Sequence, residues 1–321
     1  MKVTLLELKS IVLKKLSTIY DEGDSDKIAE VILSAELSGK YSHGLVRLLG
    51  PHFNQPNPEK YKKPEVKQLN ANVTLIDGNK NSGMLVLSIG TEEAIKIGRE
   101  NPVGIVGTIN TFSTSGYITN YLRKITSAGL IGIIMARSEN SVTGFDSKFP
   151  LFGTNPIGFG FPTKEGNFIF DFGTSIISYG GLMNLKQNGA RLPEGIAFTK
   201  DGIPTTDPDE AMKGSVLTFD KSYKSSGLAM IVEILAGVFV GAAYGNDLKN
   251  NQWGNIIITI KPDLFIQADE FKSRLSEYID FIQKNNADGR LPGELATETY
   301  NKSINQGFVE VDKDLINKIM Q

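Results

Sequence analysis

The chain has 321 residues, of which 40% are hydrophobic and 22% are charged, as in ordinary globular proteins. Its formal net charge of -2 and the lack of any Lys/Arg-rich run argue against nucleic acid as a partner. Cysteine is absent and there are only two histidines, so disulfides, thiolate nucleophiles and iron–sulfur clusters are excluded and no metal site is expected.

The first 50 residues predict helices followed by a turn. Thr4 and Glu7 form a capping box ahead of apolar residues at helical spacing, and this helix should end near Gly23. A second helix should begin at Asp24 or Ser25 and end at Gly39. The segment YSHGLVR (41–47) follows, and we expect its histidine in a turn and its arginine at the start of the next helix.

The rest of the chain alternates between segments predicted as strands and segments predicted as helices. Residues 52–80 are polar and indicate an extended connection, and helical spacing returns over 84–100. Short apolar, β-branched runs predict buried strands at 103–110, 130–137, 168–173 and 255–260. Helices are expected at 117–128, 176–188, 226–244 and 268–285. This order predicts an α/β fold in which helices cover a central sheet and the N-terminal region is helical.

One apolar segment, GLAMIVEILAGVFVGAAYG (227–245), is almost long enough to span a bilayer. It contains Glu233, which would be costly in lipid, so we expect a buried helix of a soluble core and no membrane association. At the N-terminus, Thr4, Glu7 and Lys9 interrupt the apolar stretch at once, unlike a signal peptide. A cytoplasmic location is therefore expected.

Three positions have side chains that suggest a chemical role. Histidine suits proton transfer near neutral pH and arginine suits a carboxylate, so His43 and Arg47, four residues apart, could address one small anion. A surface histidine beside an unrelated arginine is the alternative. Asp171 ends an apolar strand, where a carboxylate needs a partner. No G-x-G-x-x-G fingerprint, P-loop or G-x-S-x-G elbow occurs in a fitting context, which disfavours the commonest nucleotide folds.

Taken in order, seven segments resemble the malate/L-lactate dehydrogenase type 2 family over nearly the whole chain. They are SHGLVRL (42–48), AGLIGIIMA (128–136), FGTNPIGFGFP (152–162), FIFDFGTS (168–175), LPEGIAFTKDGIPTTDP (192–208), SGLAMIVEILAGVFVGAAY (226–244) and LPGE (291–294). The resemblance implies an NAD(P)-dependent oxidoreductase with a non-Rossmann fold. Four shorter segments are similar to the 2,3-diketo-L-gulonate reductases of that family: MKVT (1–4), SGKYSHG (38–44), SYGGL (178–182) and YKSSG (223–227).

The resemblance also implies residue roles. His43 would donate the proton to the carbonyl oxygen, and Asp171 would orient this histidine and raise its pKa. Substrate would be bound by Ser42, Arg47 and Thr111. The cofactor would be bound by Asn167, Phe168, Ile169, Phe170, Asp171, Phe172, Gly173, Tyr223, Lys224, Gly293, Glu294 and Leu295.

The chain departs from the family at two places. The pattern NxxHFG becomes INTFSTSG (109–116), so Thr111 replaces a second histidine and Ser113 a glycine. The reductase pattern WKGSG becomes YKSSG (223–227). Threonine can hydrogen-bond but cannot carry charge, so the resemblance does not fix the identity of the substrate.

We therefore expect reduction of a small 2-oxo acid, foremost 2,3-diketo-L-gulonate or a similar sugar-derived keto acid, with NADH, NADPH also being possible, by a homodimer. Three alternatives remain: another 2-oxo acid of the malate, lactate or ureidoglycolate type; a cyclic imino acid such as piperideine-2-carboxylate; or a catalytically silent relative that binds nucleotide or sugar acid. Residues 1–70 are expected to form a helical region that carries the catalytic histidine and packs with 265–321. Residues 71–264 are expected to form a sheet-containing cofactor-binding domain.

Overall fold

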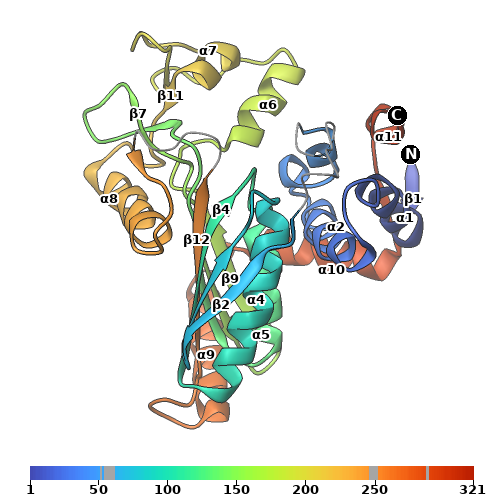
Figure 1. Ribbon diagram of the computed structural model, residues 1–321, viewed down its shortest axis with the longest axis vertical. Coiled ribbons are helices and arrows are strands. Elements are labelled where there is room, and N and C mark those ends of the chain that lie inside the picture. Colours follow the sequence, from blue (N-terminus) through green and yellow to red (C-terminus); the bar gives the residue numbers. More distant parts are fainter. Residues whose placement is uncertain (51–52, 54–61, 246–251, 287–288) are drawn as a thin grey trace.

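A seven-stranded sheet lies at the centre of the computed structural model, which describes residues 1–50, 53, 62–245, 252–286 and 289–321 (Figure 1). Its strands, from edge to edge, are β2 (Glu65–Asn70), β3 (Val73–Asp77), β4 (Val103–Thr111), β12 (Trp253–Ile260), β5 (Ile131–Ala136), β8 (Ile157–Pro162) and β9 (Asn167–Phe172). Only β3 and β4 pair in parallel, and the other neighbouring strands are antiparallel. The antiparallel order brings the C-terminal ends of β4 and β5 beside the start of β12.

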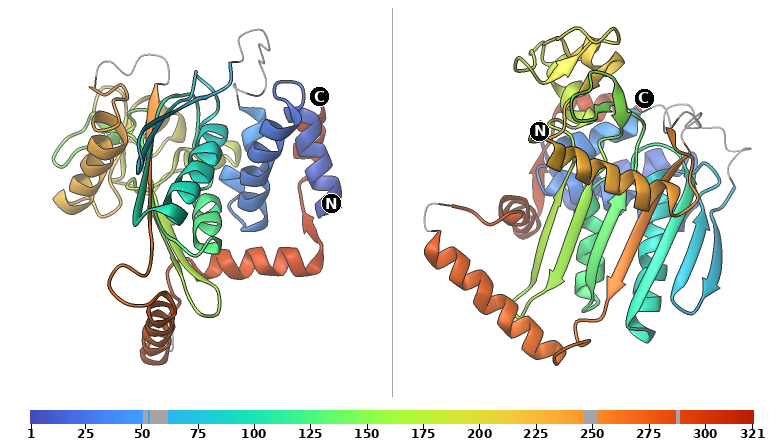
Figure 2. Two further views of the ribbon diagram at one scale, coloured as in Figure 1. Left: turned by 60° about the horizontal axis from the view of Figure 1, so that its bottom comes forward. Right: turned by 90° about the vertical axis from the view of Figure 1, so that its left-hand side faces the viewer.

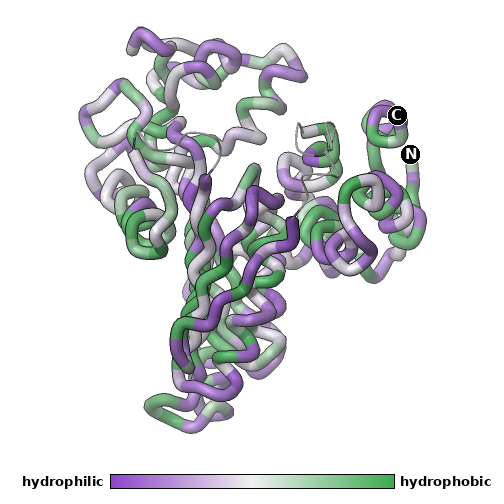
Figure 3. The backbone as a smooth tube through the Cα atoms, in the orientation of Figure 1, coloured by the Kyte–Doolittle hydropathy of each residue, from purple (hydrophilic) through white to green (hydrophobic). Residues whose placement is uncertain are grey.

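Two helices, α4 (Gly83–Glu100) and α5 (Ile118–Ser127), cover one face of this sheet. Small residues on β8 allow the close approach of α5, because a Cβ at Gly158 would lie 2.7 Å from Ile118 Cγ2. The opposite face meets α8 (Tyr223–Glu233) and the π-helical turn η4 (Ile234–Val238), which pack over β12 and β5 (Figure 2). In Figure 3, hydrophobic residues recur along the central strands and the helices that pack on them.

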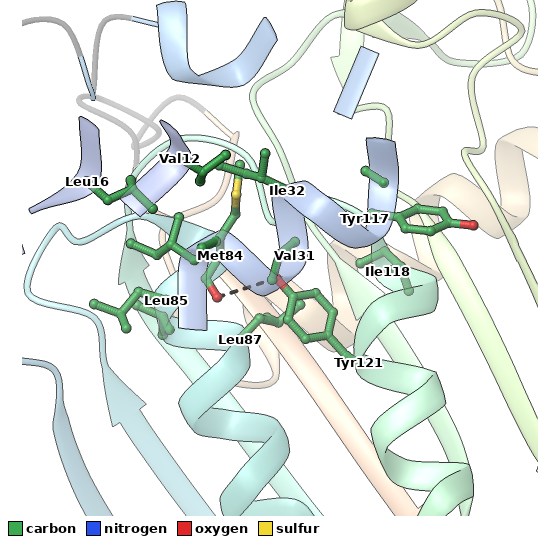
Figure 4. Close-up of a cluster of buried hydrophobic side chains, with 14 of the residues drawn as sticks. Val12, Leu16, Val31, Ile32, Met84, Leu85, Leu87, Tyr117, Ile118 and Tyr121 are labelled. Atoms are coloured by element: carbon green, nitrogen blue, oxygen red, sulfur yellow. Dashed lines mark hydrogen bonds between the residues drawn. The ribbon is translucent and has the colours of Figure 1, made fainter. Parts of the chain in front are cut away.

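The N-terminal helices build the largest core against α4 and α5. Helix α1 (Leu5–Leu16) begins with the predicted Thr4/Glu7 capping box, and α2 (Glu22–Leu37) begins after Asp21, whose side chain caps it. The two helices contribute Val12, Leu16, Val31 and Ile32 to the cluster drawn in Figure 4, where they meet Met84 and Tyr121 of α4 and α5. These contacts fix the end of α2. The chain continues from there as residues 38–50, which we call the site loop.

The C-terminal segment returns to the N-terminal helices. Strand β13 (Phe308–Glu310) pairs with β1 (Lys2–Thr4), α11 (Lys313–Met320) contacts α1, and α10 (Glu294–Gln306) contacts α2. Helix α9 (Ala268–Asn285) lies apart from this group, beyond the β8–β9 hairpin, where Lys164 N donates to Ser276 Oγ at 3.2 Å (Figure 2). The expected division into two domains stays a prediction.

A smaller four-stranded sheet lies beyond one end of the central strands, at the top of Figure 1. Its elements are β10 (Ala197–Phe198), β11 (Ser215–Val216), β6 (Val142–Thr143) and β7 (Pro150–Phe152), with α6 (Tyr179–Gln187) and α7 (Pro208–Lys213) beside them. It has a hydrophobic cluster of its own, formed by Val142, Leu182, Leu192, Ile196, Ala197, Ala211 and Val216.

The predicted fold class is confirmed, and so are the strands and helices predicted from residue 84 to 285, except for the helix over 226–244. The connection expected over 52–80 contains the hairpin β2–β3, and residues 52 and 54–61 of it lie outside the described residues. Strand β8 was not expected, because its glycines weaken the strand pattern. The helix expected over 226–244 ends at Glu233 and continues as η4, and its outer face is exposed, with Met230 at 54% and Phe239 at 66%.

In the described part of the chain, no helix is both long and apolar enough to cross a bilayer. Because the outer face of residues 226–244 is exposed, the expectation of a fully buried helix is wrong for that face. On the inner face, Val232 and Ala236 are fully buried against the sheet.

Candidate active site

A cavity of about 570 Å³ opens at the end of the central sheet where β4 and β5 end and β12 begins. His43 and Arg47 both line it, so the two side chains that the sequence singled out share one space. The other described lining residues are Gly50, Phe53, Phe112, Ser113, Thr114, Ser115, Gly116, Ala136, Arg137, Ser138, Glu139, Asn140, Ser141, Pro150, Thr154, Pro156, Ser178, Tyr179, Met212, Lys213, Gly214 and Trp253. The cavity thus lies between the site loop, the central sheet and the smaller sheet.

The site loop is not an α-helix. His43 ends the 3₁₀ turn η1 (Tyr41–His43), and Arg47 lies in a second 3₁₀ turn, η2 (Leu45–Leu49). Arg47 thus lies in a short helix, as expected, but this helix is of the 3₁₀ type and has only five residues. Gly44 separates the two turns and packs so tightly on Glu36 that a Cβ would collide with Glu36 Oε2.

Glu36, which the sequence analysis did not single out, braces this loop. The residue is 5% exposed, and its Oε2 accepts a hydrogen bond from Leu45 N at 3.0 Å. Burial raises the pKa of Glu36 to about 7, and the Leu45 bond opposes the shift. The signal in the sequence was a carboxylate on the buried face of α2, a place where such a group needs a partner.

His43 is half-buried and its Nδ1 lies 3.0 Å from Ser42 Oγ. Burial lowers the pKa of His43 to about 3, and the nearby cations Arg47 and Lys40 lower it further. The imidazole is therefore neutral at pH 7. With Nδ1 turned to Ser42, Nε2 is the nitrogen left for a substrate.

Asp171 does not act on His43 in the way that was expected. It lies on the side of β9 that faces α5, where it accepts a hydrogen bond from Thr119 Oγ1. Burial raises the pKa of Asp171, while Thr119, Lys40 and Arg123 oppose the rise. No hydrogen bond or ion pair joins it to His43 among the described residues, so the expected increase in the histidine pKa is wrong. A role of Asp171 in catalysis stays a prediction.

Arg47 offers its fork of donors to the cavity. Its Nε donates to Ser42 O at 2.7 Å, which fixes the plane of the guanidinium group. Its Nη atoms make no hydrogen bond or ion pair within the described residues. Burial lowers the pKa of Arg47, but a guanidinium stays cationic at neutral pH. A carboxylate in the cavity would meet an anchored cation whose Nη donors are not taken up by the described residues.

Thr111 is not brought to the cavity. The residue is fully buried and its Oγ1 donates to Trp253 O at 2.9 Å, a bond that ties the end of β4 to the start of β12. The five residues after it, 112–116, line the cavity instead. Sequence reasoning also missed the polar turn 138–141 and Trp253, the only tryptophan in the chain. Their signal was polar or aromatic residues directly at the ends of predicted strands.

Comparison with known proteins identifies the family of the chain. The malate/L-lactate dehydrogenase family matches residues 3–320. The chain belongs to this family. It is 33% identical to the malate/(S)-sulfolactate dehydrogenase of Methanothermus fervidus, over 98% of this chain and 95% of that protein. It is 27% identical to the ureidoglycolate dehydrogenase (NAD(+)) of Escherichia coli K12, over 78% and 74% of the two chains.

A solved structure agrees with the family. The sulfolactate dehydrogenase of Methanocaldococcus jannaschii superposes with a TM-score of 0.84 at 29% identity, covering 99% of this chain and 95% of that one. This member of the malate/L-lactate dehydrogenase family is therefore an oxidoreductase, as its relatives are named.

The residues expected to hold the cofactor of this malate/L-lactate dehydrogenase family member form two groups near β9. At one end of the strand, Phe172 packs edge-on against Phe219, 5.8 Å between ring centres, and this brings the start of α8 toward Gly173. Tyr223, at the start of α8, is 66% exposed, and Lys224 beside it is exposed as well. An exposed ring and a cation at a helix N-terminus fit the ring and phosphate parts of a nicotinamide nucleotide.

The second group lies further down the same strand. Gly293 has a φ of +82° and packs on Ile169 so closely that a Cβ would collide with the Ile169 carbonyl oxygen. Only glycine allows this contact, which places the start of α10, with Glu294 and Leu295, next to β9. None of the predicted cofactor residues is among the described residues that line the cavity, and their role stays a prediction. Within the described residues no group of three or more carboxylate or histidine side chains could hold a metal ion.

Proposed function

We propose that the chain reduces a small 2-oxo acid with NADH or NADPH and, in reverse, oxidises the 2-hydroxy acid. One observation carries this proposal: a single cavity contains an imidazole and the guanidinium group of an arginine, and Ser42 touches both. A proton-transfer group next to a carboxylate anchor suits a substrate whose reacting carbon is adjacent to its carboxylate.

The chemistry divides between the cofactor and the chain. The nicotinamide supplies or accepts the hydride at carbon 2 of the substrate. Arg47 binds the carboxylate and so orients the carbonyl group toward His43. During oxidation the neutral His43 takes the hydroxyl proton at Nε2. During reduction His43 must first bind a proton, and the bound carboxylate favours this step because it offsets the charge of Arg47.

The cofactor is proposed to lie along β9. Asn167–Gly173 and Gly293–Leu295 would supply backbone and edge contacts, Tyr223 a ring face, and Lys224 a charge for phosphate. NADH is our first choice and NADPH the second.

The substrate has two candidates. The segments shared with the diketogulonate reductases support 2,3-diketo-L-gulonate or a similar sugar-derived keto acid. The relative that is 33% identical is named for malate and sulfolactate, which supports a 2-oxo acid with a second anionic group, such as oxaloacetate or sulfopyruvate.

Cofactor oxidation, followed by absorbance, tests the proposal. The panel contains 2,3-diketo-L-gulonate, oxaloacetate, sulfopyruvate, pyruvate and piperideine-2-carboxylate, each with NADH and with NADPH. We expect turnover of at least one 2-oxo acid. Turnover of the cyclic imine alone would make the chain an imino-acid reductase, and nucleotide binding without turnover would make it a silent relative.

We also propose that the chain works as a cytoplasmic homodimer. Helix α8 and η4 expose Met230, Ile231, Ile234 and Val238 on one side at helical spacing. Beside them, α8 crosses only one end of its sheet face, and Val103, Ile260 and Ile131 form a half-buried cross-strand row at the other end (Figure 2). Such continuous apolar surface is typical of an interface, and a second copy presents the same surface.

Light scattering after size exclusion tests the dimer. Wild type should have twice the 35.1 kDa chain mass. Ile234→Glu combined with Val238→Glu should yield monomers, whereas Leu6→Glu, at an 84% exposed position on α1, should stay dimeric. A wild-type monomer at micromolar concentration would contradict the proposal.

A further inference from the structure

The first turn of α6 lies directly against the site loop. Ser178 caps this helix by accepting a hydrogen bond from Gly181 N at 3.0 Å, and both Ser178 and Tyr179 line the cavity. The next residue, Gly180, is buried and has an ordinary negative φ. Backbone conformation therefore does not require glycine at this position, and the reason must be space.

The space is taken by the two residues that hold substrate. A Cβ at Gly180 would lie 2.7 Å from Ser42 Cβ, 3.0 Å from Ser42 O and 3.2 Å from Arg47 Nη2. Real Cβ atoms essentially never come within 3.0 Å of another heavy atom. A methyl group at position 180 would therefore displace Ser42, and the Arg47 fork would have to give way as well.

Ser42 couples the two functional side chains. Its carbonyl oxygen accepts the Nε hydrogen bond of Arg47, and its hydroxyl group contacts Nδ1 of His43. Any displacement of Ser42 thus turns the guanidinium plane away from its present orientation. Because bidentate binding of a carboxylate depends on that plane, small rotations cost affinity.

We propose that Gly180 is a positioning residue for the carboxylate site: its missing side chain lets α6 press Ser42 and Arg47 into the geometry that binds a 2-oxo acid. This inference rests on the proposed function, in which Arg47 holds the carboxylate. It assigns to α6 the task of setting substrate affinity, separately from the cofactor residues on β9 and α8.

Gly180→Ala tests the inference on the 2-oxo acid that wild type reduces best. We expect KM for the acid to rise about 10- to 100-fold, since misplacing a positioned group by about 1 Å can cost about 100-fold. The dissociation constant of NADH, measured by fluorescence titration, should not change. Gly23→Ala is the control, because its Cβ would make only an ordinary contact, 3.8 Å from Asp21 Oδ1. An unchanged KM in Gly180→Ala would overturn the inference.

A double-mutant cycle separates positioning from general damage. Ser42→Gly removes the Cβ that lies nearest to the added methyl group, so Gly180→Ala should raise KM several-fold less in the Ser42→Gly background than in wild type. The same penalty in both backgrounds would show that Gly180 acts elsewhere. A wild-type protein that reduces no 2-oxo acid would overturn the proposed function and this inference together, whereas an active wild type with an unaffected Gly180→Ala variant overturns the inference alone.

Discussion

Replacing Glu36 by Gln should stabilise the protein at high pH and have little effect at low pH. The pKa of Glu36 is raised from 4.5 to about 7 because the carboxyl group is buried. The folded chain therefore prefers the protonated form. The stability that this preference provides is fully present below pH 4.5 and is lost as the pH rises through 7. Glutamine keeps an acceptor for Leu45 N but cannot ionise.

The size of the effect follows from the two pKa values. Each unit by which the pKa of Glu36 differs between the folded and the unfolded chain is worth about 1.4 kcal/mol. Part of the total is lost below pH 5, so wild type should lose about 2.5 kcal/mol of unfolding free energy through Glu36 between pH 5 and pH 8. The difference in unfolding free energy between Glu36→Gln and wild type should grow by the same amount over that range.

Urea unfolding, followed by circular dichroism at pH 5 and pH 8, measures this difference. Glu22→Gln is the matched control, because Glu22 lies on the same helix but is exposed, so this change should alter the unfolding free energy little. If Glu36→Gln and wild type kept the same difference at both pH values, Glu36 would be ionised in the folded chain. The account of how the site loop is braced would then be wrong.

Four further predictions concern the cavity. His43→Gln should lower kcat by roughly 10²- to 10⁴-fold without changing NADH affinity, and near-wild-type turnover at saturating substrate would exclude His43 as the proton-transfer group. Because the pKa of His43 is lowered to about 3, kcat/KM for reduction should fall about tenfold per pH unit between pH 6 and 8, while that for oxidation stays flat; a plateau below pH 6.5 would refute this. Arg47→Met should raise KM for a 2-oxo acid about 10- to 100-fold and leave KM for its amide nearly unchanged, and equal losses on both would make Arg47 structural. Asp171→Asn should leave the pH profile unshifted, since Asp171 bonds Thr119 on α5, and a shifted profile would show that Asp171 acts on His43 after all.

Much of the fold could be predicted because local patterns and tertiary packing agree. The capping box at Thr4 and Glu7 and the β-branched runs of β4, β5 and β12 each indicate the element that forms. Strand β8 was missed because its glycines serve the close approach of α5, which is a tertiary requirement. The outer face of α8 was expected to be buried because hydropathy does not tell which neighbour covers it.

The site was predictable in its chemistry but less so in its electrostatics. His43 and Arg47 stand out in the sequence as residue types, and the cavity holds both. The direction of the His43 pKa shift was wrong because it depends on which carboxylate is near, and Asp171 points to the α5 side of β9. Glu36 and Gly180 act through contacts with residues 8 or more positions away in the chain, which no local pattern reveals.

Transfer of label from the cofactor tests the central claim most directly. NADH carrying deuterium in both hydrogen positions of carbon 4 of the nicotinamide is incubated with the 2-oxo acid that wild type reduces best, and the product is analysed by mass spectrometry. If the chain transfers a hydride with His43 as the proton-transfer group, wild type yields a 2-hydroxy acid with deuterium at carbon 2, and His43→Gln yields it at least about 100-fold more slowly. Product without deuterium at carbon 2, or equal rates in the two proteins, would contradict the account.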